Sequence, residues 1–291
     1  MTNVDSLDND PLPEAPTDRR RSPGMRDLLH AFVWPSEAFW RHFELDMLRS
    51  QVLEGPVLEL GCGDGGFSEL AGLFVDEAID VNPRAVALAQ GRTDVYGYVQ
   101  CCDMREMAGH VKVPVRTIFA NSVLEHVPGV EDVLDACANL LVPGGRLVTT
   151  VPLRSMNDHL LLKGSWYAEF RRRQLKHHNL WSLAEWCDVL QGAGFANIAH
   201  IGYLTGDQCR FWDAIDVLGA LGVGRYRVGT ALRRVVWPRL PRSIHAAIAR
   251  SIATRLSARV NQAPCDGSPS CTAMLIATMP ISRDERDHKT S

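Results

Sequence analysis

The sequence predicts an α/β domain built around a mostly parallel β-sheet. Short apolar strands alternate with helices between residues 56 and 151, and such alternation implies parallel strands joined by right-handed crossovers. A glycine-rich turn follows the first strand and leads into a helix. The chain has 291 residues, of which 46% are hydrophobic, and this is enough to bury the core of one large domain.

Composition and charge exclude several classes of protein. The chain has 31 basic and 34 acidic residues and a net charge of −3. It therefore has no excess of positive charge of the kind that is typical of nucleic-acid-binding proteins. The eight cysteines form no Cys-x-x-Cys pair, so neither a disulfide scaffold nor a zinc ribbon is expected. No apolar run approaches the roughly 20 residues that span a bilayer, and no secretory signal is visible. We therefore expect a cytoplasmic protein.

The N-terminal part divides into a tail and a helical cap. Residues 1–24 are rich in charge and proline, so they cannot offset the entropy of ordering and are expected to be disordered. Residues 25–54 place aromatic and aliphatic side chains in a helical pattern. Pro35 divides this stretch into two short helices, because proline disrupts a helix interior.

The central elements are predicted from apolar runs and from the residues that end them. The strands are expected at residues 56–60, 78–81, 95–100, 117–120 and 146–151. The helices are expected at residues 83–90 and 130–141. Pro143, Gly144 and Gly145 close the second of these helices, since this combination is a stop signal.

The C-terminal half adds an insertion, a helix and two further strands. Residues 153–180 are rich in histidine, arginine and aromatics and are expected to form loops and helix. Ser182 and Glu185 form a capping box that opens the next helix. The last two strands are predicted at residues 198–203 and 272–279. The main domain is thus expected at residues 55–203 and 271–280, with a tail at 281–291.

Residues 204–270 are predicted to be a basic helical insertion, because 67 residues are too many for a hairpin loop. Residues 217–265 contain nine arginines and no Asp, Glu or Lys. One predicted helix face repeats an apolar residue every fourth position: Ile244, Ile248, Ile252, Leu256 and Val260. Two interpretations follow. The insertion is a helical pair packed on the domain with a solvated basic face, or residues 217–265 make peripheral contact with an anionic membrane or a lipid-linked substrate.

The most informative stretch is the glycine turn after the first strand. Gly61, Gly63 and Gly66 permit tight backbone geometry and close approach of a ligand. They also satisfy Gly-x-Gly-x-x-Gly, which is typical of dinucleotide sites. Asp80 lies 19 residues after Gly61 at the end of the second strand, where a carboxylate accepts hydrogen bonds from ribose hydroxyls. This arrangement suits either a nicotinamide nucleotide or an adenosyl ligand.

Two further features favour the adenosyl ligand. Glu59 lies two residues before the first glycine. Its negative charge would repel the pyrophosphate of a dinucleotide, but it is compatible with a ligand that carries a positive amine and a sulfonium. The segment from Asn121 to Val127 follows the fourth strand and contains Leu-Glu-His. Together with Asp80, Asp103 and the Pro-Gly-Gly turn, these segments resemble the class I S-adenosylmethionine-dependent methyltransferases of the small-molecule type.

The resemblance implies a fold and a cofactor site. The fold would be a Rossmann-like seven-stranded sheet whose last strand is antiparallel, and the cofactor S-adenosyl-L-methionine. The residues implied to bind its methionine part, ribose and adenine are Glu59, Gly61, Gly63, Asp80, Val81, Asp103, Met104 and Asn121. Two departures from the family pattern are Arg116, where an aspartate is usual, and the missing Leu-Pro-Phe run in residues 104–110.

Candidate catalytic groups are histidines near the same edge. His126 follows the fourth strand and either deprotonates a substrate hydroxyl or caps the loop. His177 or His178 in the insertion is an alternative base. Adjacent histidines do not share a face, so no metal site is expected on this pair. Cys62 is expected to be a small loop residue, because direct methyl transfer needs no covalent enzyme intermediate.

The resemblance implies methyl transfer to a small molecule, with a glycan, glycolipid or secondary-metabolite hydroxyl as the first candidates. Transfer from a sulfonium is a direct displacement for which the protein supplies alignment, desolvation and a base. A nicotinamide-dependent oxidoreductase is an alternative on the glycine pattern alone. A non-catalytic protein that keeps the cofactor fold is another.

Overall fold

The computed structural model describes residues 23–281, except residues 33, 221, 224–225, 228–238, 240–241 and 261–269. The tails predicted at residues 1–24 and 281–291 therefore lie almost wholly outside the described residues. The same holds for part of the basic segment 217–265, including Arg225, Arg233 and Arg234.

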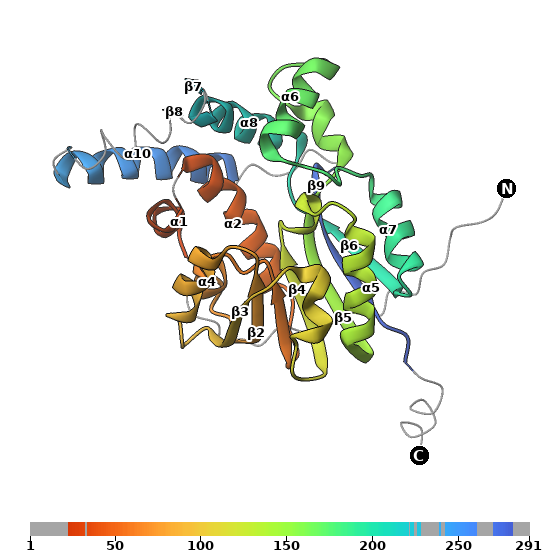
Figure 1. The fold of residues 1–291 in the computed structure, drawn as a ribbon. Helices are drawn as coiled ribbons and strands as arrows, with labels where there is room; N and C mark the ends of the chain where they lie inside the picture. The colour runs from red at the N-terminus through yellow and green to blue at the C-terminus, as the bar shows by residue number, and fades with distance from the viewer. Residues whose placement is uncertain are drawn as a thin grey trace.

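Seven strands form one sheet in the order β3-β2-β1-β4-β5-β9-β6 (Figure 1). Their bounds are Val57–Leu60 (β1), Val75–Asp80 (β2), Tyr96–Cys101 (β3), Val115–Asn121 (β4), Leu141–Pro152 (β5), Ala196–Gly202 (β6) and Thr272–Thr278 (β9). β9 is antiparallel to its neighbours β5 and β6, and the other pairings in this sheet are parallel. The predicted fold class is confirmed, including the antiparallel last strand.

Helices and short elements connect and cover the strands. The α-helices are α1 (Met25–Ala31), α2 (Pro35–Arg49), α3 (Gly66–Ala71), α4 (Pro83–Gln90), α5 (Val130–Leu140), α6 (Ser165–Leu175), α7 (Leu183–Gly192), α8 (Gly206–Ala220) and α10 (Arg242–Val260). The short elements are the 3₁₀ turns η1 (Met104–Gly109), η2 (Leu124–His126) and η3 (Arg154–His159), and the strand pair β7 (Gly222–Val223) and β8 (Tyr226–Arg227). The predicted break at Pro35 is confirmed, since Pro35 begins α2 at a position where its missing N–H is tolerated. The capping box at Ser182 and Glu185 is confirmed at the start of α7.

The boundary between α5 and β5 differs from the prediction. The helix ends at Leu140, and β5 begins at Leu141 rather than at residue 146. Leu141 already pairs with Val115, and the register shifts before Thr117 pairs with Arg146. The Pro143-Gly144-Gly145 turn is thus an irregularity within the strand, which Gly144 permits by adopting a φ of +70°. β2 also starts three residues before its predicted beginning at residue 78.

Hydrophobic cores lie on both faces of the sheet. Alternate side chains of β1 enter different clusters, because successive strand residues point to opposite faces. Val57 packs with α1 and α2 residues such as Phe39, whereas Leu58 packs with α5 and α7 residues such as Leu134. Burial on both faces explains why the strands are continuous apolar runs.

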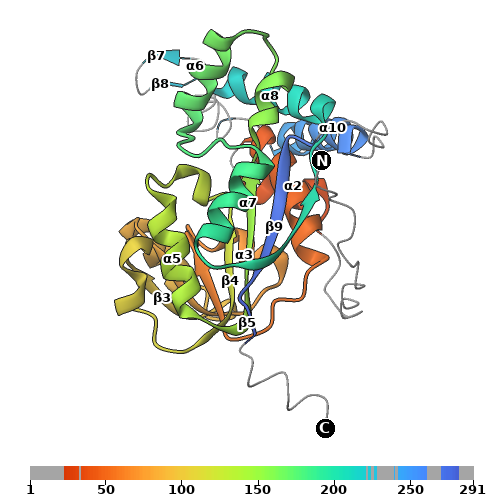
Figure 2. The ribbon, with the colours of Figure 1, turned by 90° about the vertical axis from the view of Figure 1, so that its right-hand side faces the viewer.

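A helical layer lies beyond the edge of the sheet where β9 begins and the parallel strands end. Figures 1 and 2 show α6, α8 and α10 in this layer, with α2 reaching down onto the sheet. Arg171 of α6 is 1% exposed and pairs with Asp213 and Asp216 of α8 at 2.6 and 2.7 Å. Ser36 of α2 donates to Asp216 at 2.8 Å. This polar network connects three helices that form the roof above the strand ends.

The apolar stripe of α10 is buried only toward the C-terminal end of the helix. Leu256 is 2% exposed, and Ile252 and Val260 pack against the core cluster that contains α1 and α2. Ile244 is exposed. The interpretation of a packed helix therefore holds for the second half of α10. In the described part of the chain, no helix has the length and apolar character needed to cross a membrane.

Candidate active site

The loop after β1 depends on glycines in left-handed backbone conformations. Gly61, Gly63 and Gly65 have φ values of +68°, +56° and +79°, which L side chains rarely adopt. A Cβ on Gly61 would lie 2.7 Å from a methyl group of Val123, in the loop after β4. The loops after β1 and β4 therefore touch at the carboxyl edge of the sheet, and only glycine fits at their contact.

Asp80 connects the end of β2 to this glycine loop. Its carboxylate accepts from the backbone N–H of Gly63 at 2.9 Å and of Asn82 at 2.8 Å. A carboxylate has about four acceptor sites, so these bonds leave capacity for a ligand. Asp80 thus shapes the glycine loop, a structural role that was not predicted from the sequence, in addition to its predicted role in binding.

Glu59 is a buried carboxyl group directly below the glycine loop. It is 3% exposed and accepts from the Ser68 hydroxyl at 2.8 and 2.9 Å and from the Tyr96 hydroxyl at 2.9 Å. Burial is the main reason why the pKa of Glu59 is raised to about 7, while these two hydroxyls oppose the rise. The group therefore gains and loses a proton near neutral pH.

The predicted adenine and ribose residues lie on neighbouring strand ends. Asp80 pairs in register with Cys101, and Asp103 follows two residues later. Asp103 accepts from the Arg105 side chain at 2.6 and 3.0 Å, and these bonds lower its pKa to about 2. Val81 is 70% exposed. The edge thus presents two acceptor side chains next to an exposed apolar one.

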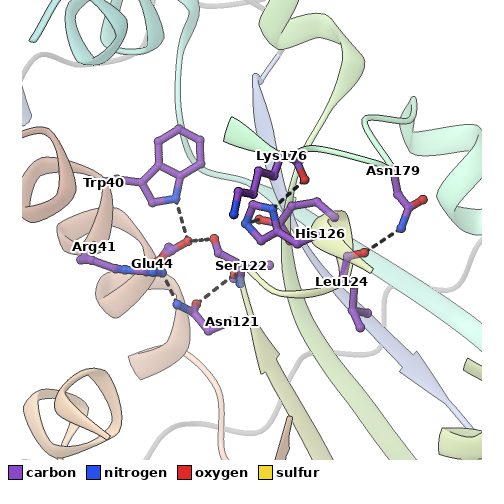
Figure 3. A network of polar contacts seen from close by, with 11 residues as sticks. Trp40, Arg41, Glu44, Asn121, Ser122, Leu124, His126, Lys176 and Asn179 are labelled. Atoms are coloured by element: carbon purple, nitrogen blue, oxygen red, sulfur yellow. Dashed lines mark hydrogen bonds and ion pairs between the residues drawn. The ribbon is translucent and has the colours of Figure 1, made fainter. Parts of the chain in front are cut away.

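Asn121 belongs to a buried polar network centred on Glu44 of α2 (Figure 3). The Asn121 amide donates to Glu44 at 2.9 Å, and the Ser122 hydroxyl also donates to Glu44. Glu44 is fully buried and accepts from Trp40 at 2.7 Å and from Arg41 at 2.6 Å. The network attaches the end of β4 to the helical roof.

Glu125, His126 and His177 form a second polar cluster beside this network. Their candidate ligand atoms all lie within 4.8 Å of one another. His126 Nε2 is 3.7 Å from Glu125 Oε1, and the His126 and His177 ring centroids are 5.3 Å apart. His178, the third predicted histidine, is exposed and is not one of these three residues. The structure thus pairs His177 with a histidine of another loop, an arrangement that the sequence analysis did not consider.

Burial dominates the electrostatics of this cluster. It raises the pKa of Glu125 to about 8 and lowers the pKa of His177 to about 3. The pKa of His126 is also lowered, mainly by burial and against the hydrogen bond to the Lys176 carbonyl. That bond joins Nδ1 to the Lys176 oxygen at 3.1 Å (Figure 3). Because a carbonyl only accepts, the bond assigns the proton to Nδ1 and leaves a lone pair on Nε2.

A separate surface hollow of about 650 Å³ lies on α6 and is lined by Trp166, Glu169, Phe170, Arg173 and Gln174. It is broad and open, and it contains none of the predicted site residues. The convergence of loops at the carboxyl edge of the sheet is therefore the better candidate, because ligands of open α/β sheets bind outside the carboxyl ends of the strands.

A family model described as a methyltransferase domain matches residues 36–200. The chain belongs to the class I S-adenosylmethionine-dependent methyltransferases. The match begins in α2 and includes β1 to β5 and most of β6, so it contains every predicted cofactor residue.

Proteins with curated names also match this region. The ubiquinone biosynthesis O-methyltransferase of Xylella fastidiosa strain 9a5c is 33% identical over 127 residues, which cover 40% of this chain and 50% of that protein. The protein of the same name from Cupriavidus pinatubonensis is 26% identical over 147 residues, which cover 46% and 59%. The chain thus spans about half the length of the curated relatives it matches.

Solved structures share the fold. A methyltransferase of Thermotoga maritima aligns with a TM-score of 0.50 at 14% identity, covering 82% of this chain and 88% of that one. A methyltransferase of Archaeoglobus fulgidus aligns with a TM-score of 0.50 at 15% identity, covering 82% and 94%. The [4+2]-cyclase SpnF aligns with a TM-score of 0.51 at 16% identity, covering 84% and 82%. At these identities the likeness shows the fold alone.

The edge of the sheet that carries the predicted cofactor residues is open beside the glycine loop. A Cβ added to Gly63 would meet nothing within 4 Å, so the glycine loop has open space next to it. Exposed Val81 and the carboxylates of Asp80 and Asp103 lie along the same edge. An adenosyl group needs an apolar contact and acceptors for its hydroxyl and amino groups, and these residues provide both.

Three residues of the site were not predicted from the sequence: Glu44, Arg41 and Glu125. Glu44 could have been recognised as a carboxylate among the apolar residues of a predicted cap helix, since such a group needs a buried partner. Glu125 was part of the Leu-Glu-His motif but received no role. Glu125 is 2% exposed, because η2 packs against β5 and its backbone is bonded to the loop after α6.

Proposed function

We propose that this protein transfers the methyl group of S-adenosylmethionine to a hydroxyl group of a small molecule. In this reaction the bond between sulfur and the methyl carbon breaks, a carbon–oxygen bond forms, S-adenosylhomocysteine leaves and the hydroxyl proton passes to a base. Bound S-adenosylmethionine supplies the electrophilic methyl group and its leaving group. The relatives named as O-methyltransferases support the choice of a hydroxyl over an amine as acceptor.

The single observation that carries this proposal is the contact between Gly61 and Val123. It joins the loop predicted to hold the methionine part to the loop that contains His126, three residues later. A methyl donor on one loop and a proton acceptor on the other would then face the same acceptor molecule. Such alignment of reacting groups is the main contribution that a protein makes to a direct displacement.

The protein groups act on the cofactor and on the acceptor separately. Asp80 and Asp103 would orient the ribose and adenine by accepting hydrogen bonds, with Val81 and Met104 against the ring. Glu59, Gly61, Gly63 and Asn121 would surround the methionine part. The His126 side chain is 42% exposed, and the free lone pair on Nε2 can accept the hydroxyl proton. Helices α2 and α6 of the roof would keep water from the reacting atoms.

The proposal predicts that His126→Ala lowers turnover strongly while leaving cofactor affinity nearly unchanged. Removal of a general base typically costs about 10²–10⁴-fold in rate. A radiolabelled methyl-transfer assay with a panel of hydroxylated acceptors measures the turnover, and calorimetry measures the affinity. His200→Ala is the matched control, because His200 is exposed on β6 at the far edge of the sheet. Normal turnover in a folded His126→Ala protein would contradict the role of His126.

The acceptor is proposed to be a hydroxylated glycan, glycolipid, lipid-linked precursor or secondary metabolite. The ubiquinone names of the relatives favour a lipid-linked precursor. A peripheral membrane contact through residues 217–265 would give access to such a substrate. Exposed Ile244, Arg250 and Arg255 on α10 support this, because an interfacial helix combines apolar and basic side chains.

A further inference from the structure

The geometry points to a divalent-cation site formed by Glu125, His126 and His177. These residues come from two segments, η2 and the loop after α6, and each offers one ligand atom within 4.8 Å of the others. Two ligand atoms on one metal ion lie about 3–4 Å apart when each is about 2.1 Å from it. The 3.7 Å separation of His126 Nε2 and Glu125 Oε1 falls in this range.

Two buried atoms of the cluster are without a hydrogen-bond partner. Glu125 Oε2 and a ring nitrogen of His177, Nδ1, are both inaccessible and unpartnered. Glu125 and His177 are 2% and 7% exposed. Buried polar atoms in folded proteins nearly always have partners, since leaving one unpaired costs about 1–3 kcal/mol. A cation bound between these side chains would remove the cost at the carboxylate and at the imidazole together.

The surroundings hold the three side chains in a geometry suited to metal binding. His126 Nδ1 donates to the Lys176 carbonyl at 3.1 Å, which directs the lone pair of Nε2 toward the cluster. Metal-binding histidines usually make a bond of this kind with their second nitrogen. The backbone N–H groups of His178 and Asn179 donate to the Glu125 carbonyl at 2.8 and 3.1 Å.

Asn179 strengthens this connection between the two segments. Its side-chain amide donates to the Leu124 carbonyl at 2.8 Å (Figure 3) and to the Val127 carbonyl at 2.7 Å. The loop after α6 is therefore attached to the chain on both sides of His126. Arg41 of α2, whose charge acts on Glu125, is already compensated by Glu44 at 2.6 Å. A cation would thus meet the carboxylate of Glu125 without an unpaired arginine of α2 beside it.

The donor set indicates the class of cation. Two imidazoles and one carboxylate suit Zn²⁺, Mn²⁺, Co²⁺ or Fe²⁺, whereas Mg²⁺ and Ca²⁺ prefer oxygen ligands throughout. Three protein ligands leave at least one coordination position open, as in catalytic metal sites. This part of the inference rests on the proposed function: the open position would take the acceptor hydroxyl, whose proton would then be released more easily to water. With the cation bound, the lone pair of His126 Nε2 is a ligand, so His126 would act as the base only in the metal-free protein.

The test is a titration of the untagged full-length protein, stripped with a chelator, with Mn²⁺ alone. Free Mn²⁺ is counted by electron paramagnetic resonance, and the heat is measured by calorimetry. We expect one bound Mn²⁺ per chain. We expect at least 10-fold weaker binding in Glu125→Gln and in His177→Ala, the loss typical of an altered metal site. His178→Ala and His200→Ala should bind as tightly as the wild type, since neither side chain belongs to the cluster.

A second measurement uses only the wild-type protein and so does not depend on variants that fold. With Co²⁺ bound, proton NMR should show paramagnetically shifted imidazole N–H signals from two histidines. The inference would be overturned if neither Mn²⁺ nor Zn²⁺ bound saturably up to about 1 mM, which is the weak end of protein cation sites. It would also be overturned if the cluster variants bound the cation as tightly as the wild type, or if no shifted histidine signals appeared. Failure of metal binding would leave methyl transfer measurable, and failure of methyl transfer would leave these isotherms unchanged, so the two proposals fail separately.

Discussion

Glu59 makes the stability of this protein depend on pH in a direction opposite to that of most carboxyl groups. The group has a pKa of about 7 in the folded protein against 4.5 in the unfolded chain, mainly because it is buried. Between these two values the unfolded chain has lost the proton that the folded protein still holds. The contribution of Glu59 to stability is therefore fully present below pH 4.5, and it is lost as the pH rises to about 7.

The magnitude follows from the separation of the two pKa values. Each unit of difference corresponds to about 1.4 kcal/mol, so the free energy of unfolding should fall by roughly 3 kcal/mol through Glu59 between pH 4.5 and pH 8. Glu59→Gln removes the titration while keeping a side chain of similar shape that can still accept from Ser68 or Tyr96. The variant should therefore gain stability relative to the wild type as the pH rises.

The assay is urea unfolding of both proteins at several pH values from 5 to 8, with the difference in free energy plotted against pH. Other titrating groups cancel in this difference, because both proteins contain them. Glu131→Gln, an exposed position on α5, controls for the loss of one negative charge. A difference between wild type and Glu59→Gln that stays constant over this pH range would refute the argument.

Two further predictions concern the cofactor edge and α10. Asp80→Ala should weaken binding of S-adenosylmethionine by 100-fold or more, since two bonds to a charged acceptor contribute about 1.5–3 kcal/mol each. The substitution should also lower the thermal midpoint of unfolding, because the backbone N–H groups of Gly63 and Asn82 lose their acceptor. Asp94→Ala, at an exposed position, is the control and should leave the affinity and the thermal midpoint unchanged. Unaltered cofactor affinity in Asp80→Ala would show that Asp80 does not bind the cofactor. The protein should co-sediment with anionic vesicles at low salt and less at high salt. Arg255→Gln should reduce vesicle binding more than Arg84→Gln does, because each arginine near the membrane surface contributes about 1 kcal/mol to binding. Equal failure to bind anionic and neutral vesicles at low salt would exclude the membrane contact.

The sequence predicted the sheet well because its signals are local. Glycines at 61 and 63, strands rich in β-branched residues, and Pro83 at the start of a helix each specify backbone conformation within a few residues. The boundary at Leu141 was missed because pairing with Val115, a tertiary contact, extends the strand past the helix end. Local propensity does not contain that information.

The candidate site was predicted in part, for the same physical reason. Asp80, Asp103 and the glycines follow strand ends, where parallel topology brings them to one edge. Glu44 and His177 come from the cap and from the insertion, and only the packed structure places them beside Asn121 and His126. Long-range contacts of this kind leave no periodic signal in the sequence. A carboxylate among the apolar residues of a cap helix nevertheless indicates that a buried polar partner exists.

Calorimetric titration of the wild-type protein with S-adenosylmethionine, S-adenosylhomocysteine and NAD⁺, under one set of conditions, distinguishes an adenosyl site from a dinucleotide site. We expect saturable binding of S-adenosylmethionine and S-adenosylhomocysteine, with one molecule per chain, and no heat of binding with NAD⁺. Saturable binding of NAD⁺ without binding of either adenosyl compound would contradict it and would favour the oxidoreductase interpretation of the glycine loop.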